Sequence, residues 1–204
     1  MMQLRSLFFT ALLAFMLVTP AASQSLDVVG ELSVHVQGGM STDPAGFDVF
    51  RETTFGSAPA FGAGFTYVIY PNVAVRGDFH YAPKSGREDC CPDLGNPGAV
   101  VEDVDLNRYY YGASLLIRFP MARAVPYLKL GGGFIDIRRD APSYQYDFAE
   151  FGTQLGGGVS LPLGDSPVSF FVDAVEWIYA RVGTGEGTQY DTLVSAGLSY
   201  AFIR

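Results

Sequence analysis

The stretch YDTLVSAGLSYAF, Tyr190–Phe202, decides the fold. Apolar residues such as Val194 and Leu198 recur at every second position, while polar residues such as Asp191 and Ser199 take the alternate positions. This period of two predicts a β-strand with one apolar face. The stretch has thirteen residues, and a tilted strand needs only about nine to eleven to cross a membrane.

The end of this strand, Tyr200-Ala201-Phe202, resembles the terminal signature of bacterial outer-membrane β-barrels. In that family the last strand closes the barrel and carries an aromatic signal for insertion. The resemblance implies that Tyr200 and Phe202 form the insertion signal. It also implies the barrel-insertion machinery as a partner.

The beginning of the chain predicts export. Met1–Arg5 carries one positive charge, Leu7–Val18 is mainly apolar, and the small residues Ala21–Ser23 suit a cleavage site. We therefore expect a signal peptide over residues 1–23 and a mature β-barrel domain over residues 24–204. The apolar run is shorter than the roughly twenty residues of a membrane-spanning helix.

The charge of the mature chain argues against nucleic acid as a partner. Arg5 is the one charged residue of the signal peptide, so twelve Lys and Arg remain against twenty-one Asp and Glu, a formal charge of −9. A phosphate backbone attracts proteins through clustered Lys and Arg. A strongly acidic chain lacks that attraction.

Eight strands follow from the alternation of apolar and polar residues. They are expected over Gly30–Met40, Ala60–Tyr70, Val73–Ala82, Val104–Phe119, Val125–Arg138, Phe148–Leu161, Val168–Arg181 and Tyr190–Phe202. The connections alternate long and short, and the longest, Pro83–Asp103, carries Cys90 and Cys91. The fold class is therefore all-β, a membrane-spanning eight-stranded antiparallel up-and-down barrel with short turns in the periplasm and long loops outside.

The parity is ambiguous in two strands. At Phe134-Ile135-Asp136-Ile137 the pattern blurs, which indicates either a bulge or the end of the membrane zone. In the seventh strand Glu176 falls on the apolar parity. A bulge near Val175 would correct this and turn Trp177 and Tyr179 outward.

The same eight strands also fit a soluble ligand-binding barrel, so the direction of the apolar face decides the class. Charged residues are few and flanked by glycine, whereas Phe, Tyr, Leu and Val crowd the other face. That bulk fits outside a narrow barrel better than inside it. A Lys or Arg facing mid-membrane lipid would also cost roughly 2–4 kcal/mol. The predicted lumenal polar network is Glu31, His35, Arg76, Asp78, Arg108, Arg118, Lys129, Glu150 and Asp173.

Two further patterns concern glycine and aromatic residues. A loop centred near residues 143–144 would pair the triplet Gly131–Gly133 with Gly156–Gly158. The inward glycines would then leave room for a small cavity or for a long side chain from the opposite wall. Aromatic residues near the strand ends predict interface girdles that include Phe119, Tyr127, Trp177 and Tyr179.

We predict no catalytic, cofactor or metal site. Ser33 and His35 share a face with Glu31, but side chains two apart on a strand lie about 6.5–7 Å apart, beyond hydrogen-bond reach. His35 is then a lumenal hydrogen-bonding residue. The adjacent Cys90 and Cys91 lack a second ligand pair for zinc, which leaves free loop thiols, a vicinal disulfide or an intermolecular bridge.

Nearly the whole mature chain resembles small outer-membrane barrels of the outer membrane protein A transmembrane-domain and outer membrane protein X type. This resemblance implies a Gram-negative-type outer membrane, contact with its lipid, and a structural or surface-interaction role through the outside loops. A narrow, porin-like channel is the first alternative. A lipid-modifying enzyme and a soluble ligand-binding barrel are the others.

Overall fold

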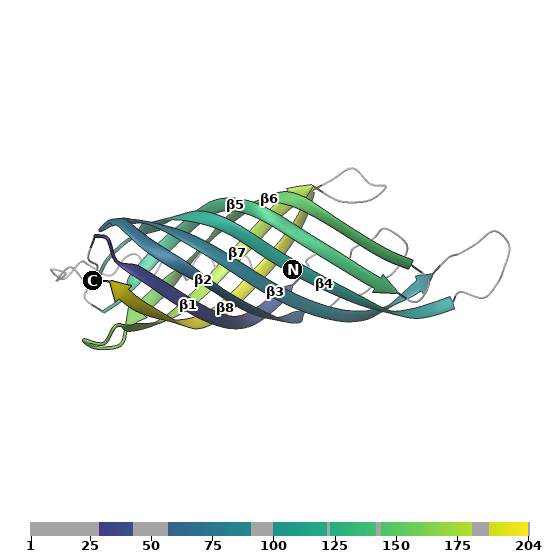
Figure 1. Ribbon diagram of the computed structural model, residues 1–204, viewed down its shortest axis with the longest axis horizontal. Helices are drawn as coiled ribbons and strands as arrows, with labels where there is room; N and C mark the ends of the chain where they lie inside the picture. Colours follow the sequence, from purple (N-terminus) through teal and green to yellow (C-terminus); the bar gives the residue numbers. More distant parts are fainter. Residues whose placement is uncertain are drawn as a thin grey trace, which may run out of the picture.

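The computed structural model describes residues 29–42, 57–90, 100–121, 123–141, 144–180 and 188–203. Its eight strands are β1 Leu32–Thr42, β2 Ala58–Tyr70, β3 Val73–Cys90, β4 Val100–Arg118, β5 Val125–Ala141, β6 Tyr144–Pro162, β7 Val168–Ala180 and β8 Thr188–Ile203. Each strand pairs antiparallel with the next, and β8 returns to β1 (Figure 1). The predicted closed up-and-down barrel is confirmed. The predicted signal peptide lies outside the described residues.

The apolar face points outward, as predicted. Val36 is 63% exposed and Leu130 is 59% exposed, while Lys129, next to Leu130, is buried inside the barrel. Closed pairing satisfies the backbone of every strand, which a membrane requires. The outer surface therefore suits lipid and the charged residues fill the lumen.

Three short turns gather at the end of the barrel where the C-terminus lies (Figure 1). They are residues 71–72, 119–124 and 163–167. The last is closed by a hydrogen bond from Leu163 N to Val168 O, 3.0 Å long, and Gly164 adopts a φ of 65°. Glycine suits this left-handed conformation because it has no Cβ to clash.

Much of the predicted loop Pro83–Asp103 is paired strand instead. The β3–β4 ladder continues through Pro83↔Asn107 to Cys90↔Val100, and Ser85 Oγ donates a 2.8 Å hydrogen bond to Asp105 Oδ1 across it. A strand with polar residues on both faces shows no alternation of apolar and polar residues, because water lies on both of its sides. Cys90 ends β3, and Cys91 lies outside the described residues.

The predicted bulge in β7 is wrong. Its register is unbroken against both β6 and β8. Trp177 and Tyr179 consequently point into the barrel, where they are only 1% and 3% exposed, and Glu176 lies on the outer parity. Trp177 and Tyr179 therefore do not belong to an interface girdle.

The blurred part of β5 is regular strand as well. The ladders of β5 with β4 and β6 run without interruption, and Ile135 and Ile137 are buried inside the barrel. The unbroken ladders rule out a bulge. The pattern blurs where this level of the lumen is itself apolar. Tyr127 is also buried inside, which removes it from the predicted girdle.

The two glycine triplets do not pair with each other. Gly131 lies opposite Gln154, and Gly158 lies opposite Tyr127. Gly133 instead sits between Gly112 on β4 and Gly152 on β6. The register differs from the prediction because β5 and β6 extend to Ala141 and Tyr144 around an earlier centre.

This glycine row makes room for the indole of Trp177. A Cβ added at Gly112 would lie 3.0 Å from Trp177 Cη2, and one added at Gly152 would lie 3.3 Å from Cε3. Those distances are tighter than ordinary van der Waals contact. Gly112 and Gly152 therefore leave room for a long side chain, but it comes from β7, which pairs with β6, and not from the opposite wall as predicted.

Candidate functional site

Asp78 is the centre of the charged residues in the lumen. Its Oδ1 lies 2.9 Å from His35 Nε2 and 2.9 Å from Arg76 Nε, and its Oδ2 lies 2.7 Å from Lys129 Nζ. These partners come from β1, β3 and β5, so the contacts span the inside of the barrel. Charge-assisted hydrogen bonds of this kind are stronger than neutral ones.

Asp173 on β7 completes the group. Its Oδ2 lies 3.3 Å from Arg76 Nη1 and 3.8 Å from Lys129 Nζ. We call Arg76, Asp78, Lys129 and Asp173 the central ion cluster. Its two cations balance its two anions, and every side chain in it is at most 4% exposed. Pairing of this kind is what makes buried charges tolerable.

Neutral side chains hold Arg76 across the lumen. Its Nη2 donates a 3.2 Å hydrogen bond to Gln37 Oε1, and its Nη1 donates a 3.3 Å bond to Tyr127 OH. Its Cζ also lies 4.7 Å from the centre of the Phe171 ring. The planar guanidinium suits this combination of directed bonds and stacking.

A second cluster lies toward the end of the barrel that is opposite the short turns. Arg108 Nη1 donates a 3.0 Å bond to Asp191 Oδ1, and the hydroxyls of Tyr110 and Tyr179 donate to Asp191 Oδ2 over 2.7 Å and 3.0 Å. We call these four residues the outer ion cluster. Trp177 packs beside it, with its ring centre 5.6 Å from that of Tyr110. Apolar side chains including Leu106, Ile135 and Ile137 fill the surrounding space.

The nine residues predicted as one polar network separate into groups. His35, Arg76, Asp78, Lys129 and Asp173 meet in and around the central ion cluster, and Arg108 belongs to the outer one. Glu31 and Arg118 line a cavity at the short-turn end. Glu150 is half-buried on the inward parity of β6 and joins neither of the two clusters as defined.

Several residues in and around these clusters were not predicted. Gln37 and Asp191 stand at inward positions in the alternation, and their parity was the available signal. Tyr110, Tyr127 and Tyr179 each present a hydroxyl to a charged group inside the barrel, although the sequence predicts Tyr127 and Tyr179 in the interface girdles. Alternation along a strand identifies the residues that face the lumen, but it does not show at which height along the barrel axis they meet.

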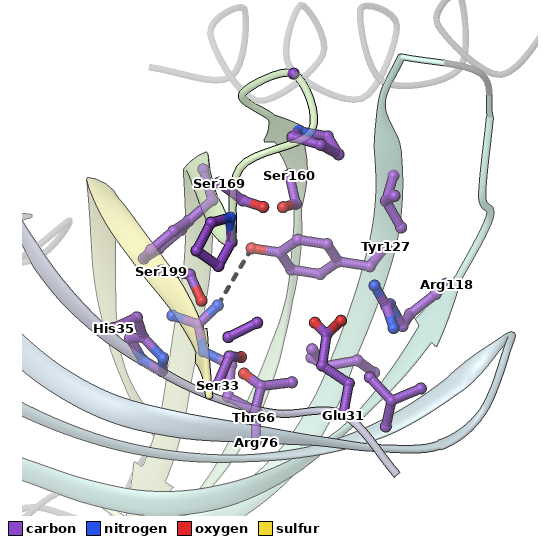
Figure 2. Close-up of a pocket in the computed structure, with 18 of the residues that line it drawn as sticks. Glu31, Ser33, His35, Thr66, Arg76, Arg118, Tyr127, Ser160, Ser169 and Ser199 are labelled. Atoms are coloured by element: carbon purple, nitrogen blue, oxygen red, sulfur yellow. Dashed lines mark hydrogen bonds between the residues drawn. The ribbon is translucent and has the colours of Figure 1, made fainter. Parts of the chain in front are cut away.

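The cavity at the short-turn end has a volume of about 300 Å³. Figure 2 shows Arg76 and His35 on one side of it, with Tyr127, Arg118 and Glu31 on the other. The central ion cluster, through Arg76, therefore forms its floor. The β6–β7 turn lies at its mouth through Gly164 and Asp165.

The arrangement does not form a catalytic triad. His35 Nε2 bonds Asp78, and in the part of the chain that the structure describes Ser33 and His35 share no hydrogen bond. Among the same residues, no group of three His, Cys, Asp or Glu side chains could hold a metal ion. Nucleophilic catalysis needs a nucleophile and a base within hydrogen-bond reach.

Tyr200 and Phe202 both face outward near the end of β8. They are 46% and 61% exposed, and their rings meet edge to face with centres 5.0 Å apart. The two rings form one aromatic patch on the outer surface at the short-turn end.

Solved structures of small outer-membrane barrels share this fold. Neisserial surface protein A has a TM-score of 0.56 at 17% identity, covering 84% of this chain and 97% of its own. Ail of Yersinia pestis, solved with the heparin analogue sucrose octasulfate, has a TM-score of 0.53 at 15% identity, covering 86% and 100%. OprG of Pseudomonas aeruginosa has a TM-score of 0.50 at 14% identity, covering 87% and 100%. A search of curated proteins finds no match.

The sequence itself matches a family. The model of the outer membrane protein beta-barrel domain matches residues 9–202, and the closed barrel with its apolar outer face is the architecture that such a domain requires. The chain therefore belongs to the outer membrane protein beta-barrel domain family and is an integral β-barrel protein of a Gram-negative-type outer membrane.

Proposed function

We propose that this protein is a closed, non-conducting membrane barrel with a structural or surface-interaction role. One observation carries the proposal: charged side chains from β3, β5 and β7, together with the imidazole of His35 from β1, meet around Asp78 in the lumen. An eight-stranded barrel has an interior just wide enough for its side chains. The central and outer ion clusters block it at two levels.

The surface role is supported by an extension of four strands. The β2–β3 ladder ends at Phe61↔Tyr81, whereas the β3–β4 ladder continues to Cys90↔Val100. Likewise the β6–β7 ladder ends at Gly152↔Tyr179 and the β5–β6 ladder continues to Ala141↔Tyr144. Strands β3 to β6 therefore project beyond the barrel opposite the short turns (Figure 1).

The charge of this extension favours a basic or neutral partner. Its exposed outward side chains include Asp105, Asp140 and Asp147, with Arg138 as a cation among them. Ail, a neighbour of the same fold, was solved with a sulfated heparin analogue. A polyanion of that kind would meet like charge on the described outward face here, which agrees with nucleic acid not being a partner.

We propose no enzymatic role. His35 is held by Asp78, and the charged groups around it, Arg76, Lys129 and Asp173, are paired. The other partners in the proposal are lipid, along the apolar belt, and the insertion machinery, at Tyr200 and Phe202. The aromatic patch of these two residues supports the latter.

Two measurements test the proposal. Protein purified from outer membranes is reconstituted in planar bilayers, where we expect no steady current; an open current that is lost when the protein is heat-unfolded would establish the channel alternative. An epitope inserted between β3 and β4 should be labelled by antibody on intact cells. Labelling only after permeabilisation would place the extension in the periplasm and end the surface role.

A further inference from the structure

The cavity at the short-turn end is bordered by hydroxyl groups from five strands. They are Ser33 on β1, Thr66 on β2, Ser160 on β6, Ser169 on β7 and Ser199 on β8. Ser33 lies opposite Thr66, and Ser169 lies opposite Ser199. The five residues thus follow one another around the inner wall, and we call them the hydroxyl wall.

These hydroxyls have unused hydrogen-bonding capacity. In the ranges that the structure describes, none of the five side chains has a hydrogen-bond partner within the protein, although Ser33 is only 7% exposed. Each hydroxyl offers one donor and two acceptor sites. Polar groups in a confined site are stabilised when these bonds are made. The wall therefore presents a converging set of donors and acceptors to whatever enters the cavity.

Part of the remaining lining is apolar and aromatic. Val68, Leu116 and Val125 contribute to the cavity, together with the ring of Tyr127 (Figure 2). The Tyr127 hydroxyl accepts a 3.3 Å hydrogen bond from Arg76 Nη1, which fixes the ring. A binding site for a small molecule commonly combines an apolar lining with a few convergent polar groups.

The lining carries no excess of one charge that would select an ion. Arg76, on the floor, is held by Asp78 and Asp173. Arg118 lines the cavity together with Glu31 and Asp165, so the lining holds two cations, Arg76 and Arg118, and two anions. The volume, about 300 Å³, is near the lower end of small-molecule pockets. These properties suit an uncharged molecule with several hydroxyls and an apolar face.

We propose that this cavity binds a small uncharged polyhydroxylated molecule of the size of a monosaccharide or cyclic polyol. The short turns place the mouth on the periplasmic side, and the central ion cluster closes the floor. The ligand enters and leaves from the periplasm without crossing the membrane. This site is independent of the proposed surface role, since the extension lies at the other end of the barrel.

The test uses protein purified from outer membranes in a detergent without a sugar headgroup. D-glucose and myo-inositol are titrated as uncharged probes, with inorganic phosphate as an anionic probe and glycine as a zwitterionic one, and binding is followed by ligand-observed NMR. We expect saturable binding of at least one uncharged probe. Absence of saturable binding for both, or tighter binding of phosphate or glycine, would overturn the proposal.

Variants locate the binding. Ser169→Leu fills the cavity from the hydroxyl wall and should weaken binding at least tenfold, while Ser85→Ala, which removes a hydroxyl at the opposite end, should not change it. The double variant Ser33→Ala with Ser199→Ala keeps the volume and should also weaken binding, so the test stands if Ser169→Leu does not fold. Unchanged binding in folded wall variants would place any site elsewhere and overturn the proposal.

Discussion

Lys129 Nζ on β5 lies 2.7 Å from Asp78 Oδ2 on β3, and each side chain is only 1% exposed. The two strands are not neighbours, because β4 lies between them in the sheet. The contact therefore bridges the inside of the barrel rather than adjacent positions of one ladder. Charges this deeply buried are stable only while their partners remain.

Removing Lys129 should destabilise the barrel strongly. In Lys129→Met the side chain keeps its length, but the central ion cluster is left with one cation against two buried carboxylates. Breaking a buried pair from one side typically costs about 3–5 kcal/mol, and we expect a loss of that size in the free energy of unfolding. Urea denaturation followed by the mobility shift on unboiled SDS gels measures it.

Two controls separate charge balance from packing. Adding Asp78→Asn to Lys129→Met restores neutrality and should recover part of the lost stability. Arg138→Met breaks the exposed contact of Arg138 with Asp136, 3.3 Å long, and should leave the urea midpoint unchanged. Equal midpoints for Lys129→Met and the unmodified protein would show that the central ion cluster does not hold the walls together.

The outer ion cluster should depend on its tyrosine hydroxyls. Tyr110→Phe and Tyr179→Phe each remove one hydrogen bond to Asp191 Oδ2. A hydrogen bond to a charged group is worth about 1.5–3 kcal/mol, so each variant should lose stability in that range in urea titrations. Tyr190→Phe is the matched control because Tyr190 faces outward from the same barrel. A similar loss in all three variants would show that removing any tyrosine hydroxyl has this effect, and that the bonds to Asp191 are not its cause.

The number of strands and their faces could be predicted because lipid and lumen impose opposite chemistry on alternate residues. Lys129 beside Leu130 is enough to orient β5, since only one of them can face lipid at low cost. The family's short turns then set the topology. These features follow from residues that are adjacent in the sequence, so the sequence alone is enough to predict them.

The levels inside the barrel could not be predicted in the same way. Asp191 meets Arg108 and Tyr110 across more than eighty sequence positions, and that meeting depends on the register of every ladder between them. Where the lumen is itself apolar, as at Ile135 and Trp177, an apolar residue does not mark the outer face of the barrel. Alternation assigns a residue to a face only when the two faces differ in polarity.

The fit of Trp177 against the glycine row predicts an effect of bulk at Gly112. In Gly112→Leu the new side chain would meet Trp177 and Gln154, so we expect a lower yield of the SDS-resistant form. Trp177 is the only tryptophan, and its fluorescence emission should shift in the protein that does fold. Gly38→Leu is the control, because a Cβ at Gly38 has no atom within 4 Å among the described residues. Identical yield and emission in the two variants would contradict the fit.

Phe202 and Phe61 offer a direct test of the insertion signal, because both face outward and expose similar fractions, 61% and 57%. If Phe202 contributed only lipid contact, Phe202→Ala and Phe61→Ala would lose similar stability in purified, refolded barrels and similar amounts of protein in cells. We expect the two variants to lose similar stability in refolded barrels. In cells, we expect Phe202→Ala to reduce the amount of folded outer-membrane protein several-fold more than Phe61→Ala does. The readout is the heat-modifiable band in outer-membrane fractions beside refolding yield in detergent. The insertion machinery would recognise Phe202 during assembly and not in the finished barrel. Equal losses of folded protein in cells for the two variants would therefore show that Phe202 is an ordinary lipid-facing residue.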